Sequence, residues 1–538
     1  MKNNIFKLLL ASGLFVAIIS SCTKKLDLKP TNDITADQVY STPEGYKEAL
    51  AKIYLAMAMP GNVGNNSGGG WGGSPDIPPE ILSDEGNTDF LRGMWYLQCL
   101  STDEAGWTYH GNTDPLGIHQ MSWSSINQTV AGAYYRSFFQ ITLINDFIRQ
   151  SSDDNLASRG ITGADADNIH HYVAEARFLR AYQYWVLMDL FGNPPFVTEK
   201  DPIGVGIPKQ INRSDLFNYI DSELIAIQPG LVSPKANEYG RVDVAADWAL
   251  LARIYLNAEV YTGKPRYTDA ITYCKKIIDA GYTLHPDYTE LMLADNNLNT
   301  DEFILTIPYD GTYTQTYGGT TLLAHAPAGV PGSISGTNGT WNCARITQQF
   351  VGLFAPGDQR GQFYTSGQNL IMTNLLDVSA DGYSTSKFRN VTRTGDPAPH
   401  ADPQGNFSDI DFPLFRLGEI YLIYAEAVLR NGDGGDKATA LGYINQLRTR
   451  AYGNNSGNIT SDDLTLNFIL DERGRELFWE CCRRTDLIRF NEFTTGAYLW
   501  AWKGGVQSGT AVDPKYNLFP IPSTDLSSNP NLKQNPGY

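Results

Sequence analysis

The sequence predicts a mainly α protein in which tetratricopeptide-like helical hairpin repeats form an α superhelical scaffold, with loop-rich insertions and a few short strands. Three observations support this prediction. Apolar residues recur at helical spacing in two pairs of adjacent segments. Two long regions between the helical blocks are rich in Gly, Pro, Asn and Thr. A chain of 538 residues with 42% hydrophobic content can bury a large core around such a scaffold.

The N-terminal segment has the pattern of a bacterial lipoprotein signal. Two lysines precede an apolar stretch over 8–19, and small residues stand just before Cys22. This stretch is too short to cross a hydrocarbon layer of roughly 30 Å, so a cleaved signal peptide over 1–21 is expected. Cys22 would then be the first residue of the mature chain and the site of lipidation, where two or more acyl chains give stable anchoring. Residues 22–35 would form the lipid-anchored tether.

Charge and cysteine usage exclude several classes of protein. The formal net charge is −17, and loss of residues 1–21 with their two lysines makes it −19. Such acidity argues against nucleic acid and polyanion partners. The cysteines other than Cys22 are an odd set with no ladder of short spacings, so neither a disulfide scaffold nor a metal site is expected. They are Cys99, Cys274, Cys343, Cys481 and Cys482.

The first part of the body supports three helices, which are expected over about 43–58, 123–150 and 165–191. The third ends at Gly192-Asn193-Pro194-Pro195, because two prolines forbid its continuation.

Amphipathic stripes in the sequence predict two helical hairpins. One pairs a helix over 417–428 with a second helix that carries the apolar residues of 440–447, and the other pairs stripes over 244–256 and 270–278. The turn over 431–436 contains two aspartates but lacks the twelve-residue ligand spacing of a calcium loop. A glycine helix cap followed by an aspartate N-cap is expected there.

The two insertions span about 60–122 and 300–412. Long insertions in a compact domain tend to carry function when they are ordered. The segment Glu302–Ile307 is predicted to form a short strand. Residues 36–538 are expected to form a single domain.

Several stretches closely resemble the SusD/RagB family. Residues 415–427 (FRLGEIYLIYAEA) match a signature of that family, and 472–489 resemble its ERxxELxxE helix with the R, DL and R that follow it. The ending over 519–538 is similar, and 174–192 and 354–360 fit the middle of the family pattern. Cys481-Cys482 depart from the pattern, which puts only the local packing in doubt.

The resemblance implies an outer-membrane lipoprotein that faces the extracellular side. It would capture oligo- or polysaccharide and deliver it to a SusC-like TonB-dependent transporter. The resemblance implies no enzyme activity and no cofactor. Two alternatives stay open, namely a peptide- or protein-binding member of the same family and a structural adaptor of the transporter complex without a ligand of its own. The signature residues Glu426, Arg448, Glu476 and Asp486 are expected to form ion pairs and caps.

Glycan binders use aromatic platforms for stacking and a few polar side chains for the hydroxyl groups of the sugar. The insertions supply both residue types. The candidate stacking residues are Trp71, Trp95, Trp107, Tyr109, Tyr313 and Trp341. The tryptophans on helical stripes are expected in the core, namely Trp123, Trp185, Trp248 and Trp479.

The sequence contains little evidence of a catalytic site. The seven histidines form no HExxH motif, and the sequence has no GxSxG elbow. The carboxylate pairs Asp84-Glu85 and Asp103-Glu104 could in principle serve a glycosidase, but carboxylates are common in an acidic chain. No catalytic residue and no metal ligand is predicted.

Overall fold

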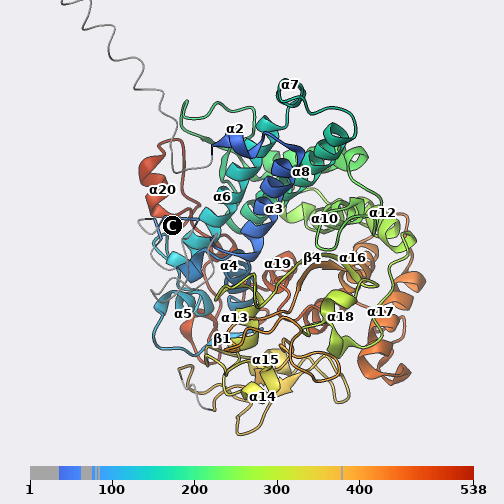
Figure 1. Ribbon diagram of the computed structural model, residues 1–538. Coiled ribbons are helices and arrows are strands. Elements are labelled where there is room, and N and C mark those ends of the chain that lie inside the picture. Colours follow the sequence, from blue (N-terminus) through green and yellow to red (C-terminus); the bar gives the residue numbers. More distant parts are fainter. Residues whose placement is uncertain (1–34, 62–75, 79–80, 83–84, 377–379) are drawn as a thin grey trace, which may run out of the picture.

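A computed structural model of the chain describes residues 35–61, 76–78, 81–82, 85–376 and 380–538. Within these ranges the protein is mainly helical, and the strands form small two-stranded sheets. Figure 1 shows α2 (Ala36–Val39) and α7 (Asp153–Ser158) in the upper part of the molecule, and α14 (Gly332–Ser335) and α15 (Gln348–Val351) of the second insertion, coloured yellow, in the lower part. The predicted mainly α fold class is confirmed.

The three predicted N-terminal helices are present. They are α3 (Pro43–Ala58), α6 (Gln128–Gln150) and α8 (Ala164–Phe191). Helix α6 begins five residues later than expected because the Asn127 side chain caps it by accepting a hydrogen bond from the Val130 amide. Helix α8 ends at Gly192, whose φ of 73° is the left-handed conformation that favours glycine.

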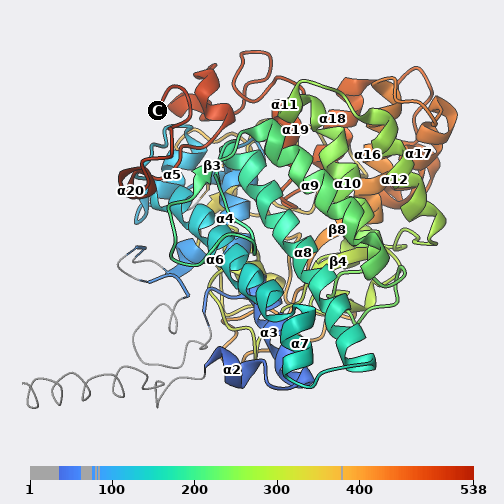
Figure 2. The ribbon, with the colours of Figure 1, turned by 90° about the horizontal axis from the view of Figure 1, so that it is seen from above.

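The helical hairpins stack as predicted. Helix α10 (Val244–Leu256) packs on α12 (Tyr267–Asp279), α12 packs on α16 (Leu417–Leu429), and α16 packs on α17 (Lys437–Tyr452). This continuous side-by-side packing, visible at the right of Figure 2, buries the apolar stripes of neighbouring helices against one another.

The turn between α16 and α17 confirms one predicted cap and corrects the other. The Asp436 side chain accepts a hydrogen bond from the Thr439 amide, as an N-cap does. The left-handed residue after α16 is Asn431, with φ 64°, and not the glycine that was expected. Asparagine tolerates this conformation better than most residues with a side chain.

The first insertion is more helical than expected. It contains α4 (Phe90–Trp95), the π-helix η2 (Tyr96–Leu100), the strand β1 (Gly106–Trp107) and α5 (Thr113–His119). In the second insertion, β4 (Phe303–Ile307) confirms the predicted strand and pairs antiparallel with β8 (Phe412–Arg416).

The remaining α-helices and strands complete the body. They are α2 (Ala36–Val39), α7 (Asp153–Ser158), β2 (Pro195–Phe196), β3 (Lys209–Gln210), α9 (Arg213–Ile227), α11 (Ala258–Thr262), α13 (Gly319–His325), α14 (Gly332–Ser335), β5 (Ala344–Arg345), α15 (Gln348–Val351), β6 (Phe363–Tyr364), β7 (Ser384–Thr385), α18 (Leu466–Glu476), α19 (Arg483–Arg489) and α20 (Ser523–Ser528).

A buried network of ion pairs ties the second insertion to the C-terminal helices. Arg416, at the end of β8, contacts the carboxylates of Glu302, Glu476 and Glu480 at 2.9, 2.7 and 2.7 Å. Arg450 of α17 contacts Glu302 and Glu476 as well. All five side chains are buried, so each charge depends on its partners for compensation.

The signature residues have the structural role expected of them. Glu426 pairs with Arg489 and Arg430, and Arg448 pairs with Glu472. Glu476 pairs with Arg360, Arg416 and Arg450. Asp486 pairs with Arg473 and Arg489. These residues therefore hold helices together.

Among the helices that the structure describes, none combines the length and the apolar character needed to span a bilayer.

Candidate functional site

The two insertions meet at a short antiparallel ladder. Strand β1 pairs with β5, with Gly106 opposite Arg345 and Trp107 opposite Ala344. Beyond the ladder, the Thr108 amide donates to the Cys343 carbonyl at 2.8 Å, and its hydroxyl donates to the Asn342 carbonyl at 3.0 Å. Tyr109 and Trp341 therefore come from nearly opposite positions of adjacent backbone segments, although more than 200 residues separate them in the sequence.

The indole of Trp341 is held against the imidazole of His325. The two rings stack with centroids 4.7 Å apart and an interplanar angle of 11°, and the Trp341 amide donates to the His325 carbonyl at 2.6 Å. Burial lowers the pKa of His325, while the contacts of its two ring nitrogens with the Gly339 and Asn406 carbonyls act in the opposite direction. Because His325 covers one face of this half-buried indole, a ligand would have to stack on the opposite face.

Tyr317 extends the aromatic group around Trp341. Its ring centroid lies 6.1 Å from that of Trp341 and 5.2 Å from that of Phe407. Its backbone carbonyl accepts a hydrogen bond from the Arg92 guanidinium at 3.2 Å, which links it to the first insertion. Tyr317 is half-buried, so part of it stays accessible.

Tyr109 provides the most exposed ring next to the ladder, with 46% of its surface exposed. It rests edge-to-face on Trp107, with centroids 6.5 Å apart and planes at 87°. We call Tyr109, Tyr317 and Trp341 the aromatic surface. Polar groups lie nearby, since the exposed Asn338 donates to the Asn406 side chain at 2.7 Å and the His325 ring contacts the Asn406 carbonyl.

Two of the predicted stacking residues are corrected by the structure. Trp95 is fully buried, because α4 directs it into the core, where it packs edge-to-face on Trp479 at 5.0 Å. Trp107 is only 2% exposed and lies beneath Tyr109, packed on Tyr96 at 5.6 Å. Neither offers a ring face to a ligand.

The other predicted site residues have different outcomes. Tyr109 and Trp341 lie on adjacent backbone segments, and the described contacts include none between their rings. Tyr313 is 79% exposed, on a turn where Asp310 accepts hydrogen bonds from two backbone amides, and its ring contacts neither Tyr109 nor Trp341 among the described contacts. Trp71 and Cys22 lie outside the described residues. Among the expected core tryptophans, Trp123, Trp185 and Trp479 are buried, and Trp248 is half-buried.

Sequence reasoning missed His325 as the partner of Trp341 and did not select Tyr317. Tyr317 is one of several tyrosines in the second insertion, and nothing in the pattern separates it from its neighbours. The stacking of His325 depends on a backbone hydrogen bond between residues sixteen positions apart, which no spacing rule predicts.

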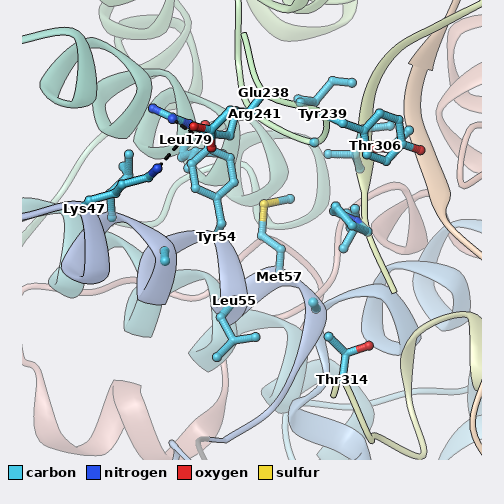
Figure 3. A pocket seen from close by; sticks show the side chains of 18 residues that line it. Lys47, Tyr54, Leu55, Met57, Leu179, Glu238, Tyr239, Arg241, Thr306 and Thr314 are labelled. Carbon is cyan, nitrogen blue, oxygen red and sulfur yellow. Dashed lines mark hydrogen bonds and ion pairs between the residues drawn. The ribbon is translucent and has the colours of Figure 1, made fainter. Parts of the chain in front are cut away.

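A concave feature lies elsewhere, between α3, the segment 238–241 and β4 (Figure 3). It is a pocket of about 280 Å³ whose wall includes Met57, Leu179 and Ile307. Its polar groups are already paired with one another. Lys47 contacts Glu238 at 3.2 Å, and Tyr54 and Arg241 both bind Glu175.

At the rim of this pocket, the Tyr239 hydroxyl donates to the Asp411 carboxylate at 2.6 Å. Burial raises the pKa of Asp411 to about 7. The pocket therefore offers mostly apolar wall and few uncommitted hydrogen-bonding groups, which suits a sugar less well than the aromatic surface does.

The described residues contain no group of three or more His, Cys, Asp or Glu side chains arranged to hold a metal ion. The chemistry of the aromatic surface is that of recognition, because it combines ring faces with the side-chain amides of Asn338 and Asn406.

Comparison with known proteins shows where the chain belongs. The SusD family model matches residues 356–538. The chain is 35% identical over 594 aligned positions to the starch-binding protein SusD of Bacteroides thetaiotaomicron, with 100% of both chains covered. It is 24% identical to SusD-like protein P25 of Formosa agariphila, over 79% of this chain and 84% of that one.

Solved structures agree with this relationship at the level of the fold. Surface glycan-binding protein A from Bacteroides fluxus superposes with a TM-score of 0.70 at 20% identity, over 92% of this chain and 100% of that one. Surface glycan-binding protein A from Bacteroides thetaiotaomicron, in complex with laminarihexaose, superposes with a TM-score of 0.67 at 19% identity, over 91% and 99%. From the full-length match above, the chain belongs to the SusD family.

Proposed function

We propose that this protein is a cell-surface glycan-binding lipoprotein of the outer membrane, anchored through Cys22, that captures neutral oligo- or polysaccharide and passes it to a SusC-like TonB-dependent transporter. The observation that carries the proposal is the aromatic surface. The Tyr317 and Trp341 rings of the second insertion lie in contact there, and Tyr109 of the first insertion lies on the backbone segment that pairs beside Trp341. Flat ring faces stack on the C–H faces of sugars, and neighbouring amides bind hydroxyl groups.

The comparisons support a glycan ligand. The relative at 35% identity is named a starch-binding protein, and a structural neighbour is described with a bound laminarihexaose. Both are binding proteins by name, in line with a role here in binding and not in catalysis. The net charge of −17 favours a neutral glycan over an acidic one.

We expect calorimetry of the mature chain to show binding to a starch-type α-glucan or a laminarin-type β-glucan. The triple variant Tyr109→Ala/Tyr317→Ala/Trp341→Ala should lower the affinity at least about a hundredfold, since each lost ring contact contributes on the order of 1 kcal/mol. The matched control is Tyr239→Ala, which removes a comparably exposed tyrosine from the pocket and should change the affinity little.

Two results would count against the proposal. One is an unchanged affinity in the triple variant, which would move the glycan site elsewhere. The other is the absence of binding to any neutral glycan, which would favour a peptide ligand or a role as a structural adaptor. Delivery is tested separately, by co-purification of the lipidated protein with the transporter and by growth on the bound glycan.

A further inference from the structure

The loop between β2 and β3 exposes several large apolar side chains close together. Ile203, Val205 and Ile207 are 74%, 71% and 50% exposed. No other five consecutive residues in the described part of the chain expose more than two large hydrophobic side chains. Side chains of this kind are normally scattered singly, and a cluster marks a contact with a partner or a membrane. We call residues 201–208 the apolar loop.

The backbone of the apolar loop holds these side chains away from the body. Gly204 and Gly206 alternate with them and have φ values of 71° and 86°. A Cβ atom added at either glycine would meet nothing within 4 Å, so the tip of the loop is surrounded by open space. The base is fixed, because the Asn531 and Asn529 side chains donate to the Ile207 and Pro208 carbonyls, each at 3.0 Å.

The surroundings of the apolar loop are basic, although the protein as a whole is acidic. Lys200, Lys209 and Lys533 are exposed next to it, and no ion pair involves them in the part of the chain that the structure describes. Of the two acidic neighbours, Glu199 is half-buried and Asp201 is exposed. Glu199 pairs with the buried Arg180 at 2.5 Å, and Asp201 accepts a hydrogen bond from the Thr198 amide at 2.8 Å.

The apolar loop lies at the end of the molecule where the described chain begins. Arg149, in the last turn of α6, donates to the carbonyl of Glu199 at the base of the loop. The carbonyl of the next residue, Gln150, accepts a hydrogen bond from Tyr46 in the first turn of α3. Figure 1 shows this end at the top, with α2, while α14 and the second insertion lie at the bottom.

We propose that the apolar loop is a membrane-contacting loop, whose aliphatic side chains enter the outer leaflet of a lipid bilayer while the three lysines bind anionic headgroups. Apolar residues flanked by lysines are the chemistry that such an interface selects. The second contact would orient the lipid-anchored protein on the bilayer. The inference rests on the proposed lipid anchor at Cys22, because the anchor determines which side of the protein faces the bilayer.

The test uses the mature chain with Cys22→Ser, so that no lipid holds it on the membrane, and sedimentation with vesicles of phosphatidylcholine and phosphatidylglycerol. We expect the chain to sediment with the vesicles, and Ile203→Ser/Val205→Ser/Ile207→Ser to lower the partition coefficient at least about tenfold. Lys200→Gln/Lys209→Gln/Lys533→Gln should lower it about tenfold on these vesicles and not on pure phosphatidylcholine.

The matched control is Ile126→Ser/Ile225→Ser/Leu298→Ser, which removes aliphatic side chains that are 76%, 49% and 62% exposed elsewhere. It should leave the partition coefficient unchanged. The proposal is overturned if the chain does not sediment with vesicles, or if the control variant weakens binding as much as the loop variant does. Loss of transporter association in the loop variant without any vesicle binding would assign the loop to a protein contact instead.

A second measurement uses the lipidated protein. Hydrogen exchange over residues 202–207 should slow when the protein is moved from detergent into anionic vesicles, and unchanged exchange would contradict the proposal. Glycan affinity, measured in solution on the same loop variants, should not change. Failure of the membrane contact and failure of the proposed glycan function are therefore separate results.

Discussion

Arg416→Met should be the most destabilising of the substitutions considered for this protein, lowering the free energy of unfolding by about 3–5 kcal/mol or preventing folding. The guanidinium compensates three carboxylates, those of Glu302, Glu476 and Glu480, and is itself only 1% exposed. Methionine keeps much of the length and removes the charge. The carboxylates then stay buried with fewer partners, and this uncompensated burial is the main cost.

The matched control is Arg430→Met. Arg430 pairs with Glu426 at 2.8 Å, but its side chain is partly exposed, and Glu426 keeps a two-bond contact with Arg489. We expect a loss of about 1 kcal/mol or less. Urea denaturation, followed by circular dichroism, compares the two variants. Equal stability of both would mean that the buried network around Arg416 contributes no more than the single pair of the partly exposed Arg430.

The helical scaffold could be predicted from the sequence because its signals are local. The stripe over 417–428, the aspartate that caps α17, and the prolines after α8 each act within a few residues of the element that they define. The late start of α6 at Gln128 shows the limit of this reasoning, since apolar periodicity before Asn127 continued the pattern without continuing the helix.

The residue types of the site could be predicted from the sequence, but the individual residues that face a ligand could not. Aromatic residues in the two insertions were expected to face a ligand, but burial is decided by contacts between distant segments. Trp95 is buried because it meets Trp479, and Trp107 because β1 pairs with β5. Tyr109, two positions further on, is exposed. Nothing within the segment 95–109 distinguishes these rings.

Charge compensation in the core also predicts how stability depends on pH. Burial alone would raise the pKa of the carboxyl groups of Glu426, Glu472 and Glu476, but neighbouring arginines overcome this effect and lower each pKa to about 2. Glu104 shows the opposite behaviour. Burial, with the charge of Asp103 as a further cause, raises its pKa to about 8.

These shifts give a stability maximum on the acid side of neutrality. The three depressed carboxyls contribute stability that is fully present above their unfolded pKa of about 4.5 and is lost as the pH falls toward 2, on the order of 3 kcal/mol for each group. Glu104 binds its proton more tightly in the folded state, so its contribution is lost as the pH rises from about 4.5 to about 8.

Urea midpoints measured from pH 2 to pH 8 should therefore peak near pH 4.5–5 and fall steeply below it. Glu104→Gln, which mimics the protonated side chain, should flatten the decline between pH 5 and pH 8 and leave the acid limb unchanged. A midpoint that stays constant down to pH 2 would show that the arginines do not hold these carboxyls ionised. A Glu104→Gln protein with the same alkaline decline would assign that decline to another buried acid, of which Asp411 is the first to examine because burial raises its pKa to about 7.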